Sequence, residues 1–154
     1  MKVTDVLVSQ HVFLRSMFVV MERTLERVET VEEVNVVARL AEGLLRGHTE
    51  AEESLLFVPL DALLTEQGQT SQFYVQHKEH TALLKQAQTA RSASEGRSDL
   101  LLAFRILRAH FHEEERLVLR VAQTAFQPES LETLGKAWLD HHALHGVVEP
   151  MAPS

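Results

Sequence analysis

The sequence predicts an all-α protein, an antiparallel up-down-up-down four-helix bundle with a short additional C-terminal helix. Apolar residues recur every three or four positions in four long segments, as they do on one face of a helix. Short turns join these segments, which favours antiparallel neighbours. Strand-like alternation and fixed internal repeats do not occur, and the 154 residues include only 6 glycines and 4 prolines. This length fits one compact domain with a sizeable core.

The first two predicted helices cover the N-terminal part of the chain. One spans about residues 4–27, where the apolar stripe has a regular helical rhythm. The other spans about residues 30–64, and it starts at Thr30, which has capping-box spacing to Glu33. Pro59 is expected to kink this second helix or to end it early.

Two further long helices and a shorter one follow. A turn around Gly68 precedes a third helix at about residues 70–91. The stretch SASEGRS predicts a break, after which Ser98 is the expected N-cap of a fourth helix whose inner stripe continues to Leu117 and Val121. A shorter fifth segment spans about residues 130–147. The expected division is 1–127 for the bundle and 128–154 for a C-terminal helix and tail packed on the same domain.

Composition excludes several classes of function. The formal charge of -7 would repel phosphate backbones, so nucleic acid is not an expected partner. The absence of cysteine excludes disulfides, thiolate zinc sites, Fe–S clusters and cysteine nucleophiles. No uninterrupted apolar run approaches the ~18 residues of a membrane span and no signal-peptide pattern opens the chain, so we expect a cytoplasmic protein without a membrane. The number of histidines, 9, is high for a chain of this length.

Several of these histidines lie on the apolar stripes of the predicted helices. His11 and His48 fall at similar distances from the first turn, about 27 Å at 1.5 Å per residue, and should therefore meet. His80 and His110 should meet in the same way across the third turn, if the fourth helix begins at Ser98. Two glutamates follow their own histidines at the i,i+4 spacing that places side chains on one face. These two carboxylates are Glu52, after His48, and Glu114, after His110.

A buried set of four imidazoles and two carboxylates predicts a site for two metal ions. It has too many ligands for one tetrahedral zinc and too many nitrogens for calcium or magnesium. If Glu52 and Glu114 bridge, each metal receives two nitrogens, two shared oxygens and room for an exogenous ligand, a set that suits iron.

At these residues the sequence resembles the hemerythrin-like HHE cation-binding domains. The order His, His-x-x-x-Glu, His, His-x-x-x-Glu on four helices carries the resemblance, over about residues 4–125. The resemblance implies two iron ions with an oxo or hydroxo bridge. It assigns His11 and His48 to one iron and His80 and His110 to the other, with Glu52 and Glu114 as bridges.

One departure from the family pattern concerns the third helix. Oxygen-carrying hemerythrins have His-x-x-x-His there, whereas this chain has Gln76 and a neighbouring His77. His77 shares the stripe of His80, so it is a candidate seventh ligand or a buried hydrogen-bond donor beside the site. If it is not a ligand, both irons have a labile position.

Three classes of function remain open. The first is a diiron protein that binds or senses O2 or NO, and the second is a diiron oxidoreductase acting on peroxide, NO or an organic substrate. The third, less favoured, is iron storage. The expected partner is a small diatomic or peroxide ligand, and a homodimer is possible.

The remaining polar residues near these motifs have simpler interpretations. His112 is expected in solvent, and Glu53, Glu113 and Glu115 are expected on solvated or boundary faces. Glu79 is a candidate acceptor for a ligand histidine. The tail run WLDHHALH could hold a second metal through its histidines, but a surface helix docked through two apolar side chains is preferred. The residues concerned are His141, His142 and His145 for the metal, and Trp138 and Leu144 for docking.

Overall fold

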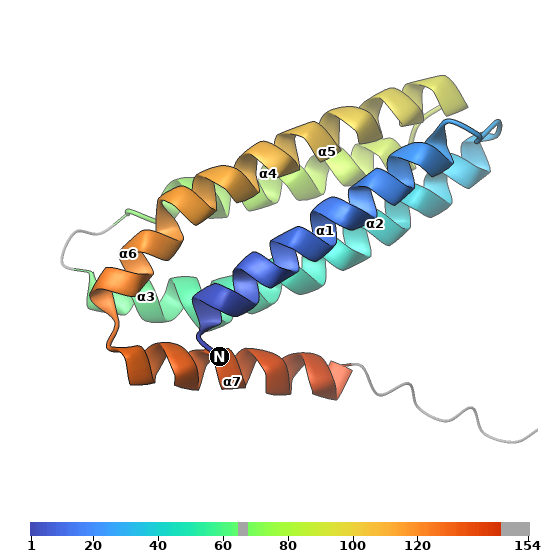
Figure 1. The fold of residues 1–154 in the computed structure, drawn as a ribbon. Coiled ribbons are helices and arrows are strands. Elements are labelled where there is room, and N and C mark those ends of the chain that lie inside the picture. The colour runs from blue at the N-terminus through green and yellow to red at the C-terminus, as the bar shows by residue number, and fades with distance from the viewer. Residues whose placement is uncertain (65–67, 146–154) are drawn as a thin grey trace, which may run out of the picture.

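The computed structural model describes residues 1–64 and 68–145, with side chains as far as residue 142, and every regular element in these ranges is helical (Figure 1). This confirms the all-α prediction for the described residues. The elements in chain order are α1 (Val3–Leu25), α2 (Val31–Glu52), the π-helix η1 (Glu53–Phe57), α3 (Val58–Leu63), α4 (Ser71–Gln88), α5 (Ala93–Arg116), α6 (Val118–Ala125) and α7 (Pro128–His145).

Four long helices lie alongside one another and enclose the core (Figure 1). Helix α1 packs against α2 and α5, and α4 packs against the same two helices. The shorter helices α3 and α6 prolong one end of this bundle, and α7 runs across that end beside the N-terminus (Figure 1). There α7 contacts α1 and η1.

The core consists of two apolar clusters with a polar layer between them. Along α1, Leu7 belongs to one cluster and Leu14 to the other, and the buried His11 lies between them. The same order holds on α2, where His48 separates Leu45 from Ala51. Because burying polar groups is costly unless they are satisfied, this layer is where a ligand would be expected.

The predicted start of the fourth helix at Ser98 is wrong, because α5 begins five residues earlier, at Ala93. Ser92 is its N-cap, and the Ser92 hydroxyl accepts a hydrogen bond from the Glu95 backbone N–H at 3.1 Å. Gly96 does not break this helix but allows close packing. A Cβ at Gly96 would lie only 2.6 Å from Val34 Cγ1 of α2.

The inner stripe predicted to continue from Glu114 to Leu117 and Val121 is also interrupted. Leu117 has φ -106° and ψ -66°, which ends α5 and starts α6. Leu117 and Val121 are only partly buried, whereas Val118 and Ala122 take the core positions. The break turns the following helix, so the stripe of α5 does not continue into α6.

The long second helix does extend towards Leu64, as predicted, but with a π-helical turn inside it. In η1 the Val58 N–H donates to the Glu53 carbonyl, an i+5 hydrogen bond. Pro59 follows in the first turn of α3, where its missing N–H costs little. The predicted irregularity therefore precedes the proline and begins directly after Glu52.

Helix α7 begins at Pro128, slightly before the predicted start at residue 130, and Trp138 anchors it as predicted. Trp138 is fully buried, and Gly135 passes so close to the N-terminus that a Cβ there would clash with the Met1 carbonyl oxygen. The side chains of Leu144 and His145, the end predicted near residue 147 and residues 65–67 of the predicted turn lie outside the described structure. The division at residue 127 stays a prediction.

Among the described residues, α1 alone has the length and hydropathy that would also suit a membrane span, with a mean hydropathy of 1.3. No such segment is expected from the sequence. About two fifths of its most apolar window, 39%, is buried inside the bundle, and core helices pass the same test. The apolar character of α1 is therefore weak evidence for a membrane.

Candidate metal centre

The four long helices bring all seven predicted ligand residues into the polar layer. Each of them is at most 4% exposed, so the cluster is shielded from bulk solvent. Six of them form two groups of three, and within each group the candidate ligand atoms lie within 4.8 Å of one another. The groups are His11, His48 and Glu52, and His77, His110 and Glu114.

Glu52 lies between the two groups and faces an imidazole of each. Its Oε1 is 3.8 Å from His48 Nε2, and its Oε2 is 3.4 Å from His77 Nε2. A carboxylate in this position can give one oxygen to each of two cations.

Glu114 is placed in a similar way on α5. Its Oε2 lies 3.7 Å from His11 Nε2 and 3.5 Å from His110 Nε2. Both carboxylates therefore connect the groups, as bridging ligands would. The two predicted His-x-x-x-Glu pairs do lie together, from different helices.

Without a cation, burial disfavours the charged forms of both glutamates and of three imidazoles in this layer. Burial raises the pKa of the Glu52 carboxyl to about 7, and burial followed by the charge of Glu52 raises the pKa of Glu114 well above its ordinary value. Burial also lowers the pKa of His11 to about 4 and that of His110 to about 2, and it holds the pKa of His48 well below its ordinary value. These three imidazoles are therefore neutral at pH 7, the state in which nitrogen binds a metal.

The residues present fit a metal centre by a second criterion, which is hydrogen bonding. All four oxygens of Glu52 and Glu114, together with Nε2 of His11 and of His48, are buried and have no hydrogen-bond partner among the described residues. Buried polar groups are nearly always satisfied, so a set of lone pairs pointing at one another indicates cations between them.

The outer nitrogens of three imidazoles are held by hydrogen bonds. His11 Nδ1–H donates to Glu115 Oε1 at 2.9 Å, and His77 Nδ1–H donates to Glu53 Oε1 at 2.7 Å. His110 Nδ1–H donates to Gln76 Oε1 at 2.7 Å. With the proton on Nδ1, each ring presents the lone pair of Nε2 to the centre, and a carboxylate acceptor makes that nitrogen more basic.

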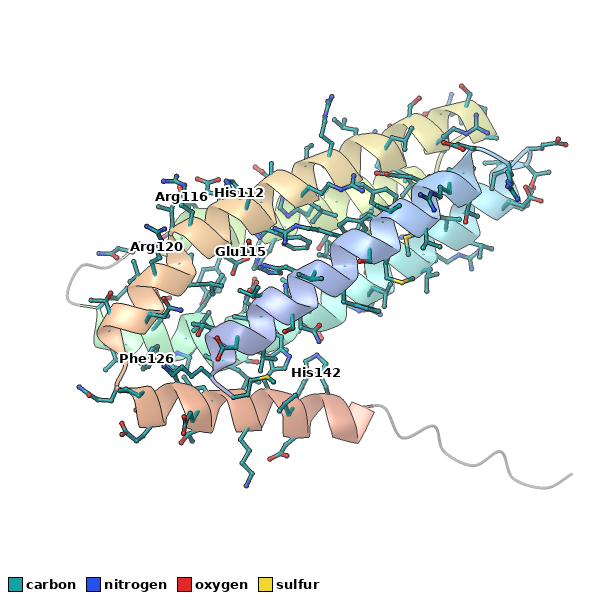
Figure 2. All side chains as sticks on the ribbon, viewed as in Figure 1. His112, Glu115, Arg116, Arg120, Phe126 and His142 are labelled. Carbon is teal, nitrogen blue, oxygen red and sulfur yellow. The ribbon has the colours of Figure 1, made fainter. Side chains whose placement is uncertain are left out.

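Sequence reasoning missed these partners. Glu53 and Glu115 were predicted on solvated or boundary faces, and their side chains are indeed 33% and 25% exposed, yet each also binds a buried imidazole. In the sequence, Glu53 and Glu115 directly follow Glu52 and Glu114, and this position is the feature that could have identified them as neighbours of the site. Figure 2 shows Glu115 on the side of α5 that faces α1 and His112 on the outer side, where it was predicted.

The π-helical turn contributes to this arrangement. It begins at Glu53, so the helical phase changes directly after Glu52. Glu52 then points into the polar layer while Glu53 reaches His77 of α4. π-helical turns frequently occur at functional sites, and here the turn places two successive carboxylates around one imidazole.

His77 and His80 occupy different places on α4. His77 Nε2 lies 3.1 Å from His110 Nε2 and belongs to the second group of three. His80 is buried beside His110, with ring centroids 4.6 Å apart, and burial lowers its pKa to about 4. Its Nδ1 has no partner among the described residues. Glu79 is exposed on α4, so the structure does not bring it into the site.

Aromatic rings surround the polar layer. Phe111 stacks on His11 at 4.3 Å, and Phe57 stacks on His77 at 5.5 Å between ring centroids. Trp138 of α7 lies 5.9 Å from His48. His142 stacks on the outer face of Trp138 at 5.2 Å and lies on the bundle side of α7 (Figure 2). These rings exclude water, which strengthens electrostatic interactions within the layer.

Comparison with known proteins agrees with this geometry. No curated protein and no solved structure matches the chain. The model of the family described as Hemerythrin HHE cation binding domain matches residues 2–122. That range covers α1 to α5 and most of α6, and therefore both groups of candidate ligands. The chain belongs to the hemerythrin HHE cation-binding domain family.

Proposed function

We propose that the protein is a non-heme diiron protein that binds or senses O2 or NO in the core of an antiparallel up-down-up-down bundle. His11 and His48 would hold one iron, and His77, His80 and His110 are the donors beside the other. Glu52 and Glu114 would bridge them. An iron pair in this position supplies redox-active Lewis-acid sites for a small exogenous ligand.

The observation that carries this proposal is the placement of the two carboxylates. Each lies between an imidazole of one group and an imidazole of the other, at 3.4–3.8 Å between nitrogen and oxygen. A single cation would leave one group of buried nitrogens and oxygens unsatisfied. Nitrogen-rich sites with bridging carboxylates favour iron over magnesium or calcium.

The chain's own residues prepare the site for such a ligand. Glu53, Gln76 and Glu115 fix the Nδ1 protons and so orient the imidazoles. The aromatic walls keep bulk water away. The two groups also differ in the number of imidazoles beside them, which leaves room for an exogenous ligand on the side with fewer nitrogens.

Metal analysis combined with absorption spectroscopy tests the proposal. The purified protein should contain about two irons per chain, and the reduced protein should change its spectrum on addition of O2 or NO. One zinc per chain, or a reduced spectrum that neither gas changes, would contradict it. Steady consumption of peroxide or NO would instead favour the alternative, a diiron oxidoreductase.

A further inference from the structure

An apolar cavity of about 230 Å³ lies at the end of the bundle, between α3, the start of α4 and α6. Among the described residues of its lining, Thr70 alone has a hydroxyl, and this hydroxyl already donates to Asp61 at 2.6 Å. None of the described residues in the lining carries a charge, and two glutamines are among them. The apolar part is formed by Leu60, Leu64, Phe73, Leu117, Val118 and Val121.

The Phe73 side chain borders both this cavity and the candidate metal centre. Phe73 lines the cavity, and its ring lies 5.8 Å from the ring of His110. Phe57, 6.3 Å from Phe73, stacks on His77 and continues the same wall. A molecule in the cavity is therefore next to the residue that shields the second group of ligands.

The other opening near the centre has a different chemical character. It lies between α2 and α4 over His77, and its lining includes Arg46, Lys78, Glu50 and Glu53. Charged groups keep such a groove hydrated, so an uncharged apolar molecule gains little there. The cavity behind Phe73 is lined by apolar side chains, and the transfer of an apolar molecule from water into such a cavity is favourable.

We propose that the cavity binds small, uncharged, apolar molecules. In this proposal a diatomic gas binds in the cavity first and then moves past the Phe73 side chain to the metals. Cavities of roughly 150 Å³ lined by aliphatic and aromatic side chains bind xenon and benzene, so the observed volume is sufficient. The second half of the proposal rests on the proposed gas-binding function. The first half concerns the protein alone and holds with or without metal.

Xenon binding tests the cavity itself. Under xenon pressure, methyl resonances of Leu60 and Val118 should shift in both the metal-free and the metal-loaded protein. Val121→Phe fills the space and should abolish the shifts. Val75→Phe, on the exposed face of α4, is the matched control and should leave them unchanged. Shifts that persist in Val121→Phe, or that arise elsewhere in the molecule, would overturn the assignment.

If Val121→Phe does not fold, Leu64→Phe fills the cavity from α3 and serves the same purpose. Benzene provides a test without any substitution. Saturating benzene should displace xenon from the wild-type cavity. Unchanged xenon shifts in the presence of benzene would contradict the binding of apolar molecules larger than a gas.

Rapid mixing of the reduced, iron-loaded protein with NO tests the route. Val121→Phe should slow NO association by about tenfold, within the range over which association rates vary among variants of one site. Phe73→Leu places a smaller side chain between the cavity and the centre and should increase the NO association rate. Val75→Phe should leave the rate unchanged. Equal rates in all four proteins would refute the route. Xenon binding without any NO binding would instead refute the proposed function and leave the cavity site intact.

Discussion

Replacing Glu52 by glutamine should change stability in opposite directions in the metal-free and the metal-loaded protein. Glu52 is fully buried, and burial raises its pKa from 4.5 to about 7. A raised folded-state pKa means that this group's contribution to stability is fully present below the unfolded pKa and is lost as the pH rises through the folded one. Glutamine has the same shape but does not ionise.

The size of the effect follows from the size of the shift. Each pKa unit corresponds to about 1.4 kcal/mol, so the metal-free wild type should lose roughly 3 kcal/mol between pH 4.5 and pH 8 through Glu52. Metal-free Glu52→Gln does not have this loss of stability. The neutral amide also removes the charge repulsion that Glu52 exerts on the Glu114 carboxylate. The histidines act in the other direction, because their lowered pKa values reduce stability as the pH falls below 6.5, and they do so in both proteins.

Bound metal reverses which of the two proteins, wild type or Glu52→Gln, is the more stable. A bridging carboxylate is deprotonated when it binds cations, and binding to the folded state stabilises it by mass action. The loaded wild type should therefore be more stable than loaded Glu52→Gln, which lacks one anionic bridge.

Urea unfolding at pH 5, 6.5 and 8, with chelator and with iron, measures both effects. Glu50→Gln, an exposed position on the same helix, is the control and should follow the wild type. The reasoning is refuted if metal-free Glu52→Gln loses stability between pH 5 and 8 as steeply as the wild type. Undiminished iron content in Glu52→Gln would refute the bridging role.

Three further substitutions test other parts of the site. His77→Ala should lower the iron content from about two to about one per chain, whereas His112→Ala, at an exposed position, should not change it; elemental analysis decides. Glu53→Ala should weaken metal affinity by about 10–100-fold, measured by chelator competition, because it removes the acceptor of a ligand imidazole. Trp138→Ala should cost about 3–5 kcal/mol in urea unfolding, whereas Leu139→Ala, at a half-exposed position, should stay within about 0.5 kcal/mol of the wild type.

The sequence was sufficient for features that depend on helical periodicity alone. His48 and Glu52 interrupt an apolar stripe at i,i+4 spacing, and the structure buries both in one polar layer. Likewise, the capping box at Thr30 and Glu33 is present, with the Thr30 hydroxyl accepting from the Glu33 N–H at 3.3 Å. These patterns are local, so no knowledge of neighbouring helices was needed to find them.

The features that were missed depend on contacts between helices. Two other serines, Ser92 and Ser94, lie just before Ser98 and can also cap a helix, and the packing of Gly96 against Val34 favours the earlier start. The partners Glu53 and Glu115 bind histidines on other helices, and those contacts depend on how each helix is rotated. No local sequence pattern specifies that rotation.

The predicted meeting of His80 and His110 is confirmed, with ring centroids 4.6 Å apart, and His77 also lies beside His110. The corrected start of α5 explains why His77 joins them. A start at Ala93 lengthens the helix before His110 by about 7.5 Å at 1.5 Å per residue, which moves its partner on α4 away from the turn and towards His77. The observed 3.1 Å between the Nε2 atoms of His77 and His110 agrees with this shift.

The same shift gives Gln76 a role. A residue at this height on α4 is opposite His110, and the Gln76 side-chain oxygen accepts the His110 Nδ1 proton at 2.7 Å instead of offering a nitrogen to the centre. An amide acceptor is neutral, whereas the acceptors of His11 and His77 are carboxylates. His110 should therefore be the least basic of the three oriented imidazoles. We expect Gln76→Glu to lower the reduction potential of the iron-loaded protein, and an unchanged potential would show that the partner of His110 does not tune the metal.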